Sequence, residues 1–233
     1  MANWETEISS SGDNSKVRGI DLETVMDMPF SDAIFLILKG EKPTERESEI
    51  FNTILSSCID HGIGNPSTVA SRTVQSGGNS MNTSVAAGIM ALGDKHGGAI
   101  EECMDLLQSE TSAEKIVEKK LEAGEKIPGL GHKVYEKEDP RSMKMLETAE
   151  KLNLKGKYTE KMLKIHRIFG EEKTRLVLNV DGAIAGIMSD LSFEPELGKG
   201  FFIIARTPGL VAHVREEMEQ PDFRRVNGDY IGD

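Results

Sequence analysis

The sequence predicts an all-α fold, and three observations support that prediction. Apolar residues recur at helical spacing along most of the chain, and capping or proline start signals precede several of these runs. Residues 84–92 are rich in small side chains, as in a buried helix that other backbones approach closely. Strand character is confined to residues 176–180, where no partner strand is evident, so a short strand and an irregular segment both remain open.

The clear helical patterns begin at about residue 45. Thr44 and Glu47 form a capping box before the first helix, which runs to about residue 60 and ends before Gly62. Asn65-Pro66 begins the next helix, because proline is favoured in a first turn. Further helices are expected at about 98–108, 112–123, 140–151, 159–169, 182–191 and 197–217.

Composition excludes several classes of protein. A chain of 233 residues with 38% hydrophobic content suits one large domain or two small ones. No apolar stretch reaches the roughly 20 residues that cross a membrane, and the polar N-terminus does not resemble a signal peptide, so we expect a cytoplasmic protein. Cys58 and Cys103 lack the paired spacing of a disulfide framework or zinc site, and no metal is expected. A net charge of −11 argues against nucleic acid as a partner.

Four short motifs combine glycine with a titratable side chain. They contain His61 in DHG, His96 in KHGG, His132 in PGLGH and Asp181 in NVDG. Glycine lets a ligand approach the backbone, and imidazole donates or accepts a proton near neutral pH. A carboxylate at a turn completes an acid/base pair. The motifs therefore indicate an acid/base enzyme.

A longer series of motifs carries a family resemblance. The chain contains, in order, RGID at 18–21, GEKPT at 40–44, DHG at 60–62, NPST at 65–68 with Arg72, KHGGA at 95–99, PGLGH at 128–132, DPR at 139–141, NVDG at 179–182 and ARTPG at 205–209 with Ala212-His213. This order, over nearly the whole chain, resembles the citrate synthase family. Citrate synthases place many helices between the PT turn and the first histidine motif, whereas about 16 residues separate Thr44 from His61 here. The chain therefore resembles the compact citryl-CoA lyase branch, which includes stand-alone lyases and the C-terminal module of ATP-citrate lyase.

The resemblance implies a domain arrangement and an assembly. It implies an all-α, citrate synthase-like fold in which a truncated large domain, residues 1–96 and 191–233, receives an inserted small domain, residues 97–190. It also implies a homodimer or homotetramer whose sites are completed across the subunit interface. Small-residue helices such as 84–92 suit tight packing between helices.

The resemblance assigns a role to each candidate site residue. Cleavage of citryl-CoA, or its formation from acetyl-CoA and oxaloacetate, passes through an enol that needs a base at the methyl carbon and a donor at the thioester oxygen. Asp181 matches the base, His96 the donor, and His132 the group that exchanges a proton with the keto or hydroxyl oxygen. The oxaloacetate ligands correspond to His61, Arg141, Arg206 and, from the neighbouring subunit, Arg225, although Val226 replaces the family's proline there. The loop that surrounds the CoA adenine corresponds to Lys126, Pro128, Gly129, Leu130 and Gly131.

Each of these residues also has a plainer interpretation. His61, just past a helix end, fits a partner of the helix dipole. Asp181, before a helix, fits an N-cap whose ionised form the dipole favours. His96 fits a structural role, and Arg141 fits a solvated surface position. Two further histidines are expected to pack or lie at the surface and are left out of the site: His166 and His213.

Three functions remain open from the sequence. The first is a citryl-CoA lyase that acts after a separate citryl-CoA synthetase, and the second is a minimal citrate synthase, which also hydrolyses the thioester. The third is a non-catalytic module that supports oligomerisation of a larger citrate-cleaving complex. A related acyl group such as propionyl is open within the same chemistry. No tightly bound cofactor is expected, because CoA is part of the substrate.

Overall fold

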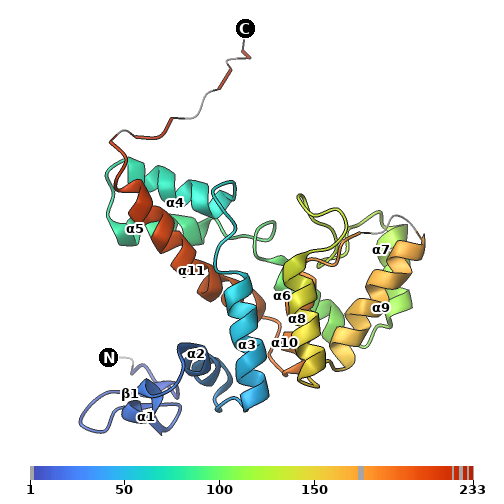
Figure 1. Ribbon diagram of the computed structural model, residues 1–233, viewed down its shortest axis with the longest axis horizontal. Coiled ribbons are helices and arrows are strands. Elements are labelled where there is room, and N and C mark those ends of the chain that lie inside the picture. Colours follow the sequence, from blue (N-terminus) through green and yellow to red (C-terminus); the bar gives the residue numbers. More distant parts are fainter. Residues whose placement is uncertain (1–2, 173–175, 222, 226–227, 230, 233) are drawn as a thin grey trace.

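The computed structural model describes residues 3–172, 176–221, 223–225, 228–229 and 231–232, and it confirms the mostly helical fold (Figure 1). Helices account for most of the described chain. Their bounds are α1 Leu22–Met26, α2 Phe30–Lys39, α3 Glu45–Ser57, α4 Pro66–Ser76, α5 Met81–Met90, α6 Ala99–Gln108, α7 Ala113–Glu122, α8 Pro140–Lys151, α9 Lys157–Glu172, α10 Val180–Asp190 and α11 Leu197–Glu217. The predicted capping box is present at α3, where Thr44 and Glu47 bind each other's backbone.

Strands occur where the sequence did not predict them. Three two-residue strands, β1 Ser9–Ser10, β2 Lys16–Val17 and β3 Ile20–Asp21, form a small antiparallel sheet. Arg18 and Gly19, both with positive φ, make the tight turn between the last two. The strand considered at 176–180 is absent from the described residues there, since Leu178 forms only a single bridge with Leu130.

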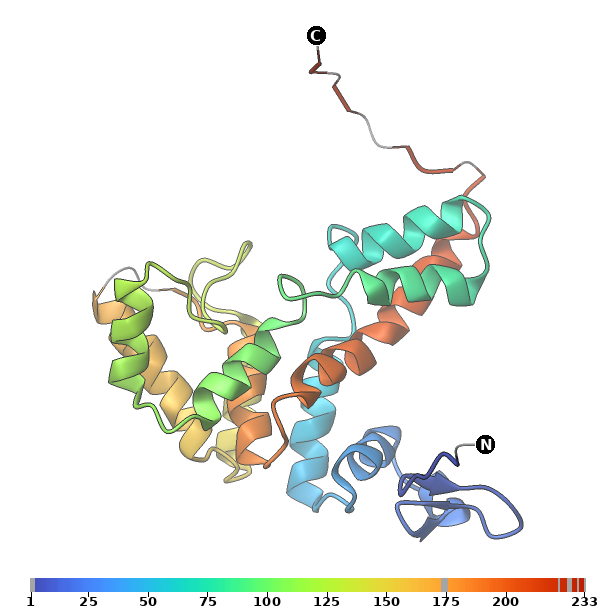
Figure 2. The same ribbon diagram turned by 180° about the vertical axis from the view of Figure 1, so that it is seen from behind.

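The helices from α4 onward form two groups (Figures 1 and 2). In one group α10 is the central element, buried along almost its whole length, and α6, α8 and α9 pack against it while α7 packs on α9. In the other group α4 and α5 lie side by side against the long α11. Helix α11 also contacts α3 and α6, so it joins the two groups. The division resembles the expected inserted domain, but the boundaries 97–190 stay a prediction.

Phenylalanine rings consolidate the junction between the groups. Phe35 of α2 and Phe51 of α3 meet edge to face at 5.4 Å, and both contact Phe193, which follows α10. Phe201 of α11 packs on Phe51 and Phe193 with ring centroids 6.1 and 5.0 Å away. Such contacts add to the free energy of burial and fix the relative positions of α3, α10 and α11. Among the described helices, none combines the length and the apolar character needed to cross a membrane.

Candidate active site

The turn after α3 presents His61. Its ring lies edge-on to that of His132, with centroids 5.8 Å apart. Burial lowers the pKa of His61, and the charges of Arg141 and Arg206 lower it further. The ring is therefore neutral at physiological pH and lies within the field of both arginines.

His132 is held in one tautomer by the backbone that follows it. Its Nδ1 accepts hydrogen bonds from the N–H groups of Val134 and Tyr135, both at 3.0 Å. A neutral ring with an accepting Nδ1 carries its proton on Nε2. Arg141 Nη2, itself a donor, lies 3.2 Å from that Nε2. Two donors thus converge on one point, an arrangement suited to a ligand oxygen.

Arg141 is oriented by Asp139. The fully buried Asp139 carboxylate accepts from Arg141 Nε at 3.0 Å and from Nη2 at 2.8 Å. It also caps α8 through the Arg141 N–H and accepts from the Val180 N–H at 3.1 Å. Although burial opposes ionisation, the hydrogen bonds from Arg141 hold the pKa of Asp139 below its usual value. One carboxylate therefore ties the guanidinium to the start of α10, so the surface interpretation of Arg141 is wrong.

Asp181 is the second residue of α10, and Asn179 caps that helix. The Asn179 side chain accepts from the N–H groups of Asp181 and Gly182 at 3.0 and 3.2 Å. The expectation that Asp181 is the N-cap is therefore wrong. Burial raises the pKa of Asp181 to about 6, although the charges of Arg141 and Arg206 oppose the rise. Desolvation thus outweighs the helix dipole, which was expected to favour the ionised form.

The loop that precedes His132 is fastened to the start of α10. The Asn179 amide donates to the Gly131 carbonyl at 2.8 Å, and the Asn179 N–H donates to that of Gly129 at 3.0 Å. A Cβ on Gly129, whose φ is +87°, would lie 2.6 Å from the Cα of Gly182. Lys126 is exposed at the start of the loop, Pro128 is half-buried, and Leu130 is buried. The loop and Asp181 therefore share one rigid support.

His96 lies in a tight turn between α5 and α6. Its Nε2 is 2.8 Å from Ser67 Oγ, in the first turn of α4. Gly97, with φ of +91°, packs so closely on Phe202 that a Cβ would lie 2.6 Å from that ring. Burial lowers the pKa of His96, as does the charge of Arg206. The ring is neutral and fixed between α4 and α11.

Arg206 is buried in the middle of α11, with 1% of its surface exposed. Its Nε donates to the Cys58 carbonyl at 2.8 Å, and its guanidinium lies 5.0 Å from the centre of the Phe202 ring. Its Nη1 has no hydrogen-bond partner among the described residues. An unpaired buried guanidinium N–H is costly, so this group is suited to an anionic ligand.

Arg225 is the one expected site residue that lies apart. It is exposed beyond the end of α11, and its guanidinium lies 4.7 Å from the centre of the Phe223 ring. Further along the chain, the described residues 228–229 and 231–232 extend away from both helix groups (Figure 1). Its expected role, in a neighbouring subunit, stays a prediction.

Three supporting residues were not singled out from the sequence: Ser67, Asp139 and Asn179. Each lies within or beside a quoted motif, but its role depends on a contact made through the fold. The motifs placed these residues near the expected site but did not indicate which group each of them contacts.

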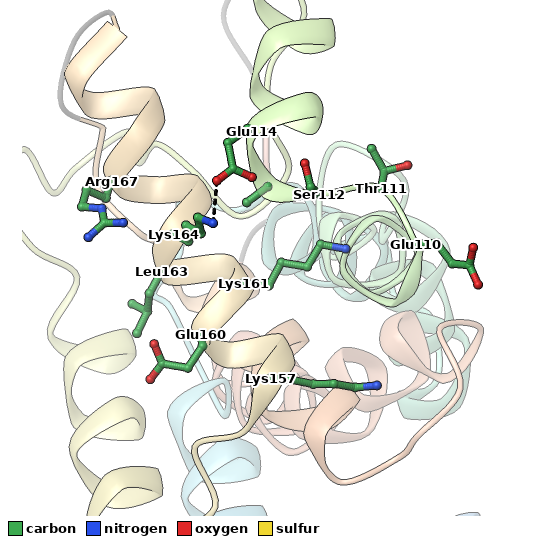
Figure 3. A pocket seen from close by; sticks show the side chains of 11 residues that line it. Glu110, Thr111, Ser112, Glu114, Lys157, Glu160, Lys161, Leu163, Lys164 and Arg167 are labelled. Atoms are coloured by element: carbon green, nitrogen blue, oxygen red, sulfur yellow. Dashed lines mark ion pairs between the residues drawn. The ribbon is translucent and has the colours of Figure 1, made fainter.

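A separate groove lies between the start of α7 and α9 (Figure 3). It measures about 680 Å³, and none of the expected site residues lines it. Lys161 there donates to the carbonyls of Leu107 and Ser109, and Lys164 pairs with Glu114. These lysines serve the packing of α6, α7 and α9. The described part of the chain contains no cluster of metal-ligating side chains.

Comparison with known proteins identifies the family. The model of the citrate synthase C-terminal domain matches residues 3–226. The chain belongs to the citrate synthase family. Citrate synthase 2 of Bacillus subtilis is 35% identical over 84% of this chain and 54% of its own length. The chain thus spans about half the length of the curated relatives it matches.

Solved structures of the family share the fold. A citryl-CoA lyase from Hydrogenobacter thermophilus superposes with a TM-score of 0.94 and 44% identity, over 99% of this chain and 95% of that one. An ATP citrate lyase from Methanothrix soehngenii, in complex with citrate and coenzyme A, gives a TM-score of 0.89 at 22% identity over 42% of its length. A Thermotoga maritima citrate synthase gives 0.76 at 25% identity over 58% of its length.

Proposed function

We propose that this chain is a citryl-CoA lyase, which cleaves citryl-CoA to acetyl-CoA and oxaloacetate through an enol intermediate. The observation that carries the proposal is the likeness to a citryl-CoA lyase at 44% identity over nearly all of both chains. The geometry of the site supports it, because donors and one half-buried carboxylate converge from α3, α8, α10 and α11. The proposed reaction is the one known for relatives, and this chain has side chains suited to its steps.

Asp181 is the proposed acid and base. With a pKa of about 6 it is mostly ionised at neutral pH yet readily protonated. In cleavage it returns a proton to the enol carbon, and in condensation it removes one from the thioester methyl. His96 donates to the thioester oxygen, with Ser67 fixing the ring.

The proposed oxaloacetate site is built from fixed donors. Arg206 offers its unpaired Nη1 to one carboxylate. Arg141 and the Nε2–H of His132 meet the other carboxylate and the keto oxygen, and His61 closes the site from the α3 turn. The family resemblance adds a further arginine, Arg225, from a neighbouring subunit.

The remaining proposals concern CoA and the partners. The backbone of the loop from Lys126 to Gly131 faces the adenine, while CoA acts as part of the substrate and no tightly bound cofactor takes part. The enzyme is a homodimer or homotetramer in the cytoplasm, and a separate citryl-CoA synthetase supplies its substrate. Its large domain is proposed to comprise residues 1–96 and 191–233, and its small domain residues 97–190.

A minimal citrate synthase is the second candidate. Its support is that relatives at 30–35% identity are named citrate or 2-methylcitrate synthases. Both candidates share the carbon–carbon step, and only the synthase admits water to the citryl thioester. An oligomerisation module is the third candidate. The buried Nη1 of Arg206, which has no partner among the described residues, argues against it, because a scaffold gains nothing from an unpaired N–H.

Supplying purified protein with citryl-CoA and separating the products over time tests the proposal. A lyase yields acetyl-CoA and oxaloacetate in equal amounts. Citrate and free CoA as the main products would establish the synthase instead. Unchanged citryl-CoA would reject both enzymes. The Asp181→Asn variant, assayed in parallel, corrects for spontaneous hydrolysis.

A further inference from the structure

One face of helix α11 contacts the turn that carries His61. Arg206, Gly209 and His213 are spaced by three and four residues, so they lie above one another on the helix surface. They meet three consecutive residues of the turn. Arg206 Nε donates to the Cys58 carbonyl, and a Cβ on Gly209 would lie 2.3 Å from the Ile59 carbonyl oxygen.

The third contact joins His213 to Asp60. His213 Nε2 lies 3.0 Å from Asp60 Oδ1, and the two side chains are 18% and 39% exposed. The other carboxylate oxygen, Oδ2, accepts from the Gly62 N–H at 2.9 Å. Asp60 therefore binds the helix with one oxygen and, with the other, closes the backbone turn around His61. Gly62 permits that turn with φ of +75°.

We infer that Asp60 and His213 form a positioning pair that sets the direction of the His61 ring. Neither side chain is assigned to the substrate, so the pair acts through His61. The same face of α11 carries Arg206, and this helix therefore fixes two of the expected oxaloacetate ligands relative to each other. The inference rests on the proposed function for its kinetic consequence, but not for the geometry of the ring.

Kinetic variants test the consequence. His213→Ala and Asp60→Ala each remove the contact, and we expect the KM for oxaloacetate to rise about tenfold while kcat changes about twofold or less. The double variant should be no worse than Asp60→Ala alone, because Asp60→Ala already removes the contact with His213 as well as the bond from Gly62. His213→Gln keeps an N–H donor near the Nε2 position and should recover most of the affinity. Glu219→Gln, on an exposed ion pair with Arg215 near the end of α11, is the control and should match the wild type.

A spectroscopic readout separates positioning from general destabilisation. In protein labelled with ¹⁵N-histidine, His61 is assigned by its loss in His61→Gln. His213→Ala should shift the His61 ring resonances and leave those of His166 in place. If the alanine variant unfolds, the same resonances are compared in His213→Gln, which is a smaller change. The inference would be overturned if the His61 resonances did not move or if KM were unchanged. It would also be overturned if the rise in KM in the double variant equalled the product of the two single-variant rises. Absence of turnover in the wild type would reject the proposed function alone, since the resonance shift still decides the positioning.

Discussion

At the scale of single residues, the site depends on how burial sets protonation. Asp181 lies where an ionised carboxylate is partly desolvated, and its pKa of about 6 results. The three candidate histidines all have lowered pKa values, with burial as the first cause. The site therefore offers one base and several neutral donors near pH 7.

Removing the carboxylate tests the role of that base. We predict that Asp181→Asn lowers turnover by at least about a thousandfold, because the amide cannot accept the methyl proton. Binding of oxaloacetate, measured by calorimetry, should stay within about threefold of the wild type. Turnover above a tenth of the wild-type rate would remove Asp181 from the mechanism.

The same variant has a predicted effect on stability. The folded chain holds the Asp181 proton more tightly than an unfolded chain, whose pKa is near 3.8. Between about pH 4 and pH 6 the folded state carries more protons than the unfolded state. The contribution of Asp181 to the stability of the fold therefore decreases as the pH rises through that window. Asp181→Asn should therefore be more stable than the wild type at pH 7.5, by about 1–3 kcal/mol, and about equal to it at pH 4. Equal unfolding midpoints at both pH values would show that Asp181 is not desolvated.

The positions of the candidate residues were easier to predict than the contacts that support them. The NVDG motif identified Asp181, but two possible caps lie two residues apart in it, and only the fold shows that Asn179 caps α10. Asp139 orients Arg141, which is two positions away, and its carboxylate also accepts from the N–H of Val180 at the start of α10, 41 positions along the chain. Such support depends on contacts between distant segments, which local patterns do not encode.

At the scale of elements, local signals predicted the helices from α3 onward well, but not α1 and α2, and they predicted the strands poorly. The capping box at Thr44 and the proline at position 66 both mark true helix starts. The N-terminal strands, two residues each, are too short to show any alternation. The apolar segment at 176–180 found its backbone partners in the loop at 129–131, so its β-branched residues lead into α10 without forming a strand.

The contact between that loop and α10 can be tested with matched glycines. Gly129 and Gly124 both have positive φ, but a Cβ on Gly124 would meet no atom within 4 Å, whereas one on Gly129 would strike Gly182. We predict that Gly124→Ala costs about 1 kcal/mol from backbone strain alone. Gly129→Ala should cost at least about 2 kcal/mol more and reduce turnover, as measured by denaturant unfolding and by the product assay. Equal costs would mean that the loop does not rest on α10.

At the scale of the whole molecule, α11 and the C-terminal segment connect the site to its surroundings. The fully buried Glu217 side chain pairs with Arg72 of α4 and Arg224 beyond the helix. The Arg224 N–H also donates to Ser76 Oγ at 2.9 Å. The chain therefore leaves α11 in a fixed direction, and Arg225 follows immediately.

A shared site predicts complementation between inactive variants. Arg225→Ala should lose most activity if its guanidinium completes a neighbouring site. Mixing it with Asp181→Asn under conditions of subunit exchange should restore about a quarter of wild-type activity, because half of the dimers are mixed and each has one intact site. No recovery, despite mixed dimers detected by mass spectrometry, would place Arg225 outside the partner's site.

The proposed active site forms and breaks the carbon–carbon bond through an enol of acetyl-CoA. The most direct test follows acetyl-CoA and oxaloacetate in D₂O by proton NMR. Reversible condensation and cleavage should replace the methyl hydrogens of acetyl-CoA with deuterium while little free CoA accumulates, and Asp181→Asn should show no exchange. A methyl signal that stays unexchanged in the wild type, without citrate formation, would contradict the account.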